Sequence, residues 1–158
     1  MGDDWGMQSG PIMNPEVFRT IFKPKYRKLI EMVKNKTNAK VCLHTCGATY
    51  WVLSDLIDVG VDVVHPLQPT AAGNEDPIKI KKEFGDKLVF YSNIANTTIL
   101  PKGTPQEVSE EVKRKIKTLA PCGGYIFSGG HNIQADVPPE NIVALFDTAY
   151  KAGCYPIR

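Results

Sequence analysis

The chain has 158 residues, of which 42% are hydrophobic and 23% are charged, and its formal net charge is +2. These values are typical of a globular domain that can bury a core, and they give no electrostatic argument for binding nucleic acid or an anionic membrane. No apolar run approaches the ~20 residues of a membrane span, and the N-terminus MGDDWGMQSG lacks a signal-peptide pattern, so we expect a cytoplasmic protein.

The predicted elements alternate between strand and helix after one opening helix. Asn14 is placed to cap that helix with Pro15 at its first position, and a kink is expected at Pro24. Thr104 and Glu107 form the pattern of a capping box at a later helix start. In chain order we predict helix 15–36, strand 40–46, helix 49–60, strand 61–68, helix 75–85, strand 86–94, helix 104–120, strand 123–130 and helix 138–153.

Four strand–helix units in a row predict an α/β fold with a parallel sheet and helices outside it. The β-branched residues on both faces of 61–68 favour a sheet that is covered on both sides. The glycine-rich stretch 123–130 brackets a strand and lacks the order of a dinucleotide-binding fingerprint. The other parallel architecture, the (β/α)8 barrel, takes about 250 residues, so this chain could hold about half of one.

All three histidines fall at the C-terminal ends of predicted strands, where both parallel architectures place their sites. His44 and Cys46 are two residues apart on an extended strand and therefore share one face. His131 follows another strand and could supply a third ligand. Zinc takes His and Cys ligands in tetrahedral geometry, and a catalytic site leaves the fourth position open. The alternative is a reduced cysteine packed against a hydrogen-bonded histidine.

The other cysteines are weaker candidates. Cys42 alternates with His44 and Cys46, so it could share their face. Cys122 precedes its strand, which places it at the opposite rim and behind His131 as a third ligand. Cys154 is expected to be a small, partly buried thiol.

Adjacent carboxylates, Asp3 and Asp4, precede Trp5 near the N-terminus. If a strand ends there, one carboxylate points into the site and the other points away. The inward one could serve as a general acid or base, as a fourth metal ligand or as a hydrogen-bond acceptor for substrate. A solvated acidic N-terminus is the alternative.

With these residues, the sequence resembles the C-terminal half of the uroporphyrinogen decarboxylase superfamily. That superfamily includes the decarboxylase of haem synthesis and cobalamin-dependent methyltransferases. The resemblance runs from Gly2 to about Ile142 and rests on GDDWGMQSGPIMNPEVFRTIFKP, KVCLHTCG, LIDVGVDVVHPLQ, LPKGTPQEV and GGYIFSGGHNIQADVPPENI. It implies the C-terminal half of a (β/α)8 TIM-type barrel, with residues 1–158 as one partial domain that lacks the N-terminal half.

The resemblance also implies roles for the strand-end residues. In the methyltransferases a His-x-Cys pair and a later cysteine bind zinc, which activates the accepting thiol. His44 and Cys46 match the pair, and His131 stands where the later cysteine would be. In the decarboxylases a histidine at that position lies near the pyrrole rings of the substrate, so His131 fits both branches. The His-Thr-Cys-Gly strand end favours the methyltransferase branch.

Three hypotheses follow from the residues and the resemblance. The first is a fragment or subunit of a zinc-dependent methyltransferase whose donor is a corrinoid such as methylcobalamin, with a corrinoid protein as a possible partner. The second is a metal-free decarboxylase acting on a tetrapyrrole, in which His131 orients substrate or moves a proton. The third is a non-catalytic half-barrel that pairs with a second copy or with a separate N-terminal half. In the first, the small-molecule substrate pocket would be lined by Asp3 or Asp4, His65, Gln68 and Asn93.

The resemblance also argues against activity of this chain alone. The arginines and the aspartate with which the decarboxylases hold the porphyrinogen come from the N-terminal half. The corrinoid pocket of a methyltransferase likewise draws on the whole top of the barrel. The sequence therefore leaves open whether the chain is an active enzyme by itself.

Overall fold

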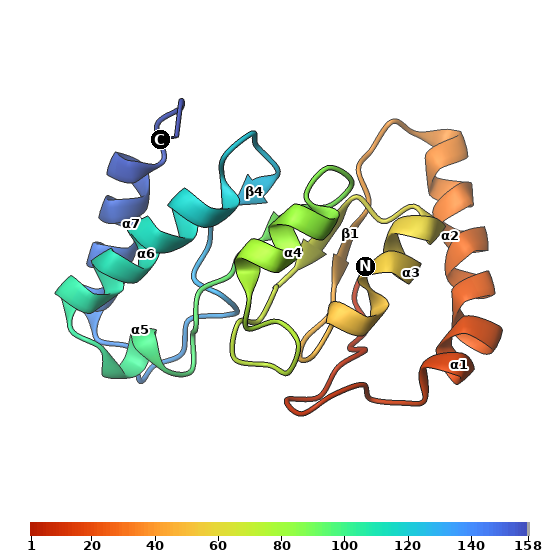
Figure 1. Cartoon of the computed structure of the whole chain (residues 1–158), viewed down its shortest axis with the longest axis horizontal. Coiled ribbons are helices and arrows are strands. Elements are labelled where there is room, and N and C mark those ends of the chain that lie inside the picture. Colours follow the sequence, from red (N-terminus) through yellow and green to blue (C-terminus); the bar gives the residue numbers. More distant parts are fainter. Residues whose placement is uncertain (158) are drawn as a thin grey trace.

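The computed structural model describes residues 1–157, and its centre is a four-stranded parallel sheet in the order β1-β2-β3-β4 (Figure 1). The strands are β1 (Cys42–His44), β2 (Val63–His65), β3 (Val89–Tyr91) and β4 (Tyr125–Ile126). The α-helices are α1 (Pro15–Val17), α2 (Lys23–Lys36), α3 (Leu53–Val59), α4 (Pro77–Phe84), α5 (Ile99–Lys102), α6 (Pro105–Leu119) and α7 (Pro139–Ala152). Every predicted element is present, although the strands are shorter than predicted. The short helix α5 was not predicted.

The predicted opening helix is divided into three parts. A π-helical segment, Phe18–Phe22, separates α1 from α2, and the N–H of Lys23 donates to the carbonyl of Phe18. Pro24 has no N–H to donate and its ring crowds the preceding turn, so a wider turn is accommodated just before it. The kink predicted at Pro24 is therefore replaced by a change of helix type.

The predicted helix ends are confirmed where side-chain chemistry defines them. Asn14 accepts a hydrogen bond from the N–H of Glu16 at the start of α1. Thr104 and Glu107 form the reciprocal capping box at the start of α6. Gly60 ends α3 in the left-handed region, with a φ of 97°, where a side chain would add strain.

Helices cover only one face of the sheet. Leu43, Val64 and Phe90 point to that face and are fully buried against α2, α3 and α4. On the opposite face His44 and Tyr91 are only half-buried, and Ile126 is 41% exposed. The prediction of a sheet covered on both sides was therefore wrong for the described residues, since the second face is the one that a closed barrel would turn inward.

The N-terminal segment lies beside β1 as a further parallel strand would. Gly2 forms a parallel bridge with His44, and the N–H of Asp3 donates to the carbonyl of His44 at 3.0 Å. The N–H of His44 in turn donates to the carbonyl of Met1 at 2.9 Å. This pairing places the residues after Gly2 at the same edge of the sheet as the end of β1.

Candidate metal centre

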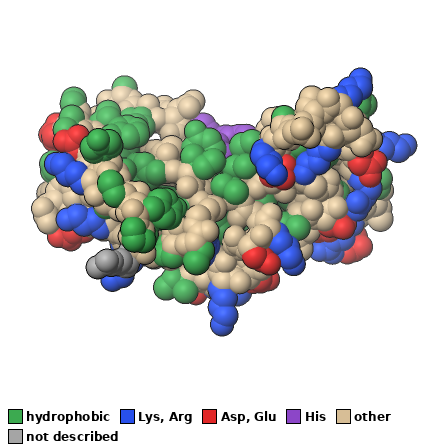
Figure 2. All heavy atoms as spheres, turned by 90° about the horizontal axis from the view of Figure 1, so that it is seen from above, with side chains coloured by type: hydrophobic (Ala, Val, Ile, Leu, Met, Phe, Trp, Pro, Cys, Tyr) green, Lys and Arg blue, Asp and Glu red, His purple; other side chains and the backbone are tan. Residues whose placement is uncertain are grey.

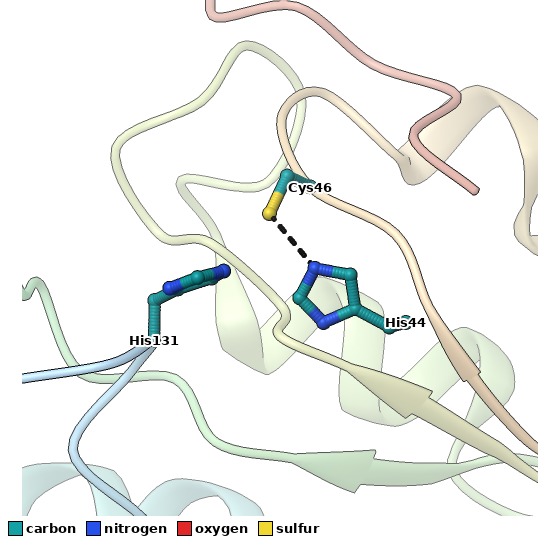
Figure 3. A group of neighbouring side chains, drawn as sticks. All are labelled: His44, Cys46 and His131. Atoms are coloured by element: carbon teal, nitrogen blue, oxygen red, sulfur yellow. Dashed lines mark hydrogen bonds between the residues drawn. The ribbon is translucent and has the colours of Figure 1, made fainter. Parts of the chain in front are cut away.

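Three of the predicted site residues converge at the C-terminal edge of the sheet. Donor atoms of His44, Cys46 and His131 all lie within 4.8 Å of one another. The Sγ of Cys46 is 3.4 Å from the Nε2 of His44, and His131 approaches from the other side (Figure 3). Figure 2 shows histidine side chains reaching the surface between the two ends of the molecule, so the cluster is accessible.

Strand alternation after β1 places His44 and Cys46 together. Between them, Thr45 points the other way, is fully buried and accepts a hydrogen bond from the N–H of Trp5 at 3.0 Å. Gly47 then turns the chain with a φ of 77°. A Cβ on Gly47 would lie 2.3 Å from the carbonyl oxygen of Gly6, so only glycine fits there.

A hydrogen-bonded turn after β4 positions His131. The buried hydroxyl of Ser92 donates to the carbonyl of Ser128 at 2.9 Å and accepts from the N–H of Gly130 at 2.7 Å. Gly130 has a φ of 92°, and a Cβ on it would lie 2.6 Å from the carbonyl oxygen of Ile94. The loop that carries His131 is thereby held against the end of β3.

The donor set fits a zinc ion. A tetrahedral zinc ion with bonds of about 2.0 to 2.3 Å needs donor atoms roughly 3.3 to 3.8 Å apart. The Cys46–His44 separation of 3.4 Å already matches that spacing, and His131 needs only a small side-chain movement. Burial, followed by the charge of Asp4 and a hydrogen bond to it, raises the pKa of the Cys46 thiol to about 11. A bound cation would offset that preference for the protonated thiol.

The two N-terminal carboxylates diverge as strand alternation predicts. The Oδ1 of Asp4 accepts a hydrogen bond from the N–H of Cys46 at 2.8 Å and lies 3.9 Å from the Nε2 of His44. Asp3 turns the other way and accepts a hydrogen bond from the hydroxyl of Tyr26. Of the pair, Asp4 is therefore the carboxylate that borders the candidate metal centre.

His65 and Gln68 come from β2 and the loop after it. The Nδ1 atoms of His65 and His44 are 3.0 Å apart, and burial, with the nearby rings of His44 and His131, lowers the pKa of His65. The Oε1 of Gln68 accepts from the N–H of Gly47 at 3.2 Å. His65 thus contacts His44 itself, and Gln68 contacts the turn that directly follows Cys46.

Asn93 does not line the site. Its side chain is fully buried, donates to the carbonyl of Leu67 at 2.7 Å and accepts from the Nζ of Lys115 on α6. Being next to a strand end places the backbone of Asn93 near the site, but its side chain points to the helix layer. Asn93 is therefore not the substrate contact that was expected. It is a structural link between two loops and α6.

A cavity of 190 Å³ adjoins the donor atoms. Cys46 and His131 contribute to its wall, as does Gln68. Asn96 and Thr97, which sequence reasoning missed, add polar groups from the loop after β3. Their only sequence signal was their place in ANTT, two and three residues beyond the predicted strand 86–94. The wall consists of Cys46, Pro66, Gln68, Ile94, Asn96, Thr97, Gly130 and His131.

The remaining cysteines lie outside the cluster. Cys42 is half-buried on β1 and does not belong to the group of converging donors. Cys122 is exposed and precedes β4, at the opposite end of that strand from His131, as predicted. Cys154 is exposed rather than partly buried, because it follows the end of α7 where little chain packs over it.

The sequence profile described as uroporphyrinogen decarboxylase (URO-D) matches residues 2–152. The chain belongs to the uroporphyrinogen decarboxylase family. The resemblance inferred from the residues is thereby confirmed. Among residues 1–157, no helix is both long enough and apolar enough to cross a membrane.

Individual relatives in the uroporphyrinogen decarboxylase family carry two different activities in their names. A uroporphyrinogen decarboxylase from Ruthia magnifica subsp. Calyptogena magnifica is 26% identical over 152 residues, covering 94% of this chain and 40% of that protein. The methylcobamide:CoM methyltransferase MtaA from Methanosarcina barkeri is 28% identical over 138 residues, covering 87% of this chain and 37% of that protein. The chain thus spans about 40% of the length of such relatives.

A solved structure shows the same fold. A methyltransferase from Methanosarcina mazei superposes with a TM-score of 0.68 at 23% identity, covering 90% of this chain and 39% of that one. Together with the parallel sheet, this confirms the predicted fold class: four consecutive βα units of a (β/α)8 TIM-type barrel.

Proposed function

We propose that this chain is part of a zinc-dependent, corrinoid-linked methyltransferase in which His44, Cys46 and His131 hold the metal. The observation that carries the proposal is the convergence of one thiol and two imidazoles within 4.8 Å at the edge of the sheet. The fourth tetrahedral position would face the cavity and bind the acceptor, a thiol or a similar soft nucleophile. Zinc, when bound, would lower the pKa of the acceptor and hold it as a reactive anion.

The residues of the chain would then orient the acceptor and move its proton. The Asp4 carboxylate lies 3.9 Å from the Nε2 of His44, close enough to accept the proton that the acceptor releases. Gln68 and Asn96 line the cavity and would orient the rest of the acceptor. The methyl donor would be a corrinoid, carried by a partner protein, and the complex is expected in the cytoplasm.

The thiol in the donor set supports a methyltransferase function over a decarboxylase function. A thiolate ligand leaves more negative charge on a zinc-bound sulfur than a set of neutral imidazoles does, so the bound acceptor stays nucleophilic. The relative named methylcobamide:CoM methyltransferase MtaA supports the same branch of the family.

A second candidate function is a metal-free decarboxylase acting on a tetrapyrrole. It is favoured by the name of the relative from Ruthia magnifica and by the place of His131 in the cavity wall. His131 would then orient the substrate or shuttle a proton. Binding of an anionic porphyrin by a metal-free, folded chain would support this candidate.

We also propose that the chain works with a partner that covers its open side. The apolar side chains of Val143, Phe146 and Tyr150 on α7 are 60%, 48% and 85% exposed. Ile126, on the edge strand β4, is 41% exposed. Figure 2 shows apolar side chains gathered at the end of the molecule that holds α7. A free strand edge beside an apolar surface is typical of an interface, here with a second copy or with a separate N-terminal half.

Metal content tests the primary proposal. Purified wild-type chain should contain about one zinc ion per chain by inductively coupled plasma mass spectrometry, and Cys46→Ser should lose it. The matched control is Cys122→Ser, which removes an exposed thiol at the other end of the sheet and should keep the metal. A folded wild-type chain without zinc would overturn the metal proposal and favour the decarboxylase candidate.

A further inference from the structure

We propose that His65 is a positioning residue of the metal centre. It holds the ring of His44 and, through the backbone of Gly130, the loop that carries His131. The inference rests on the proposed metal site and goes beyond it. It replaces the expectation that His65 contacts substrate, because His65 is not part of the cavity wall.

The first contact is between two imidazole rings. The Nδ1 of His44 lies 3.0 Å from the Nδ1 of His65, and the ring centroids are 5.1 Å apart. In Figure 3 one nitrogen of His44 faces Cys46 and the other points away from it. A nitrogen that binds a metal uses its lone pair, so the proton of His44 must sit on Nδ1. His44 then donates and His65 accepts.

The second contact follows from the first. Because the Nδ1 of His65 accepts, its proton must sit on Nε2. We infer that this Nε2 donates to the backbone carbonyl of Gly130, which lies within hydrogen-bonding reach of the His65 ring. Gly130 directly precedes His131, and its N–H is already held by the hydroxyl of Ser92. Two hydrogen bonds in series therefore connect one metal-facing histidine with the backbone of the other.

The ring of His65 is itself held in place. It lies 4.5 Å from the ring of Tyr91 between centroids, and the neighbouring strands β1 and β2 pair His44 directly with His65. Metal-binding histidines commonly donate to a carboxylate or a carbonyl. Here the acceptor is a neutral imidazole, which orients His44 without adding negative charge. The centre therefore retains more positive charge for an anionic acceptor.

Substitutions at position 65 separate the two hydrogen bonds. His65→Ala removes both and should weaken zinc binding by about 10-fold to 100-fold, measured by competition with a chromophoric chelator. In His65→Asn the amide oxygen replaces Nδ1 and keeps the acceptor for His44. In His65→Gln the amide nitrogen replaces Nε2 and keeps the donor to Gly130. Each should restore part of the loss, and both should fold like the wild type by circular dichroism.

The tautomers give a second readout that a merely structural role would not produce. Long-range ¹H–¹⁵N spectra of zinc-loaded chain should show His44 protonated on Nδ1 and His65 protonated on Nε2. Zinc affinity of folded His65→Ala within twofold of wild type, or His65 protonated on Nδ1, would overturn the inference while leaving the proposed function intact. A folded wild-type chain that binds no zinc would instead overturn both.

Discussion

At the scale of single residues, the environment of Cys46 determines what the site can do without metal. Burial is the largest cause that raises the pKa of the Cys46 thiol to about 11, and the Asp4 carboxylate adds to it. A thiol with this pKa is protonated at neutral pH and is a poor nucleophile. Such a cysteine suits a metal ligand, which loses its proton when the cation binds, better than a free catalytic nucleophile.

Replacing Asp4 tests this electrostatic account. In metal-free chain, Asp4→Asn should lower the pKa of Cys46, because a negative charge that disfavours the thiolate is removed while burial remains. Alkylation of Cys46 by iodoacetamide at pH 9, followed by mass spectrometry of its peptide, should become about threefold to tenfold faster. Asp3→Asn is the matched control, since Asp3 faces Tyr26 and should leave the rate unchanged. A slower reaction in Asp4→Asn would contradict the account.

At the scale of elements, a buried lysine joins α6 to the site loops. The side chain of Lys115 is 2% exposed, its Nζ donates to the Oδ1 of Asn93, and it lies 3.6 Å from Glu111. Asn93 in turn donates to the carbonyl of Leu67, next to the cavity wall. Burial lowers the pKa of Lys115 to about 8.

The lowered pKa of Lys115 makes stability depend on pH. The folded state releases this proton near pH 8 and the unfolded state near pH 10.5, so between them the unfolded chain binds more protons. This group therefore disfavours folding below pH 8, and the penalty decreases as the pH rises toward 10.5. Relative to Lys115→Met, the wild-type free energy of unfolding should rise by on the order of 2 kcal/mol between pH 7.5 and 10. Urea unfolding at several pH values measures it, and a constant difference would contradict the assignment.

The N-terminus of α6 offers a second prediction about an element. Thr104→Ala removes the side chain that accepts from the N–H of Glu107 and should lower the free energy of unfolding by about 1 kcal/mol. Thr118→Ala, in the same helix but without a capping role, should change it by less than about 0.5 kcal/mol. Urea unfolding of both variants provides the comparison, and equal effects would show that the cap is not what stabilises this end.

At the scale of the whole molecule, the described residues form an open half-barrel. Two buried clusters hold it together, one between the sheet and α2–α4 and one among α5–α7. Neither cluster covers the free edge of β4 or the exposed apolar stripe on α7 that Val143, Phe146 and Tyr150 form. The molecule is thus stabilised on its helical side and left open on the side that would close a barrel.

Charge on the α7 stripe should weaken association. Val143→Asp combined with Tyr150→Asp is expected to raise the dissociation constant of the self-associated chain, or of its complex with an N-terminal half, by at least about tenfold. Sedimentation velocity measures this. Ile78→Asp on α4 is the matched control, because Ile78 is 68% exposed but lies on a helix outside the stripe. Unchanged sedimentation of the double variant would place the interface elsewhere.

Sequence patterns alone determined the order of the elements, the caps at Asn14 and Thr104, and the strand-end positions of His44 and Cys46. Each of these depends on hydrogen bonds or side-chain alternation within a few residues, so short patterns predict them. Only the tertiary structure decided that His131 comes within 4.8 Å of the pair and that Asn93 turns away toward Lys115. Those placements depend on how distant segments pack and on buried hydrogen bonds between them, and neither leaves a local pattern in the sequence.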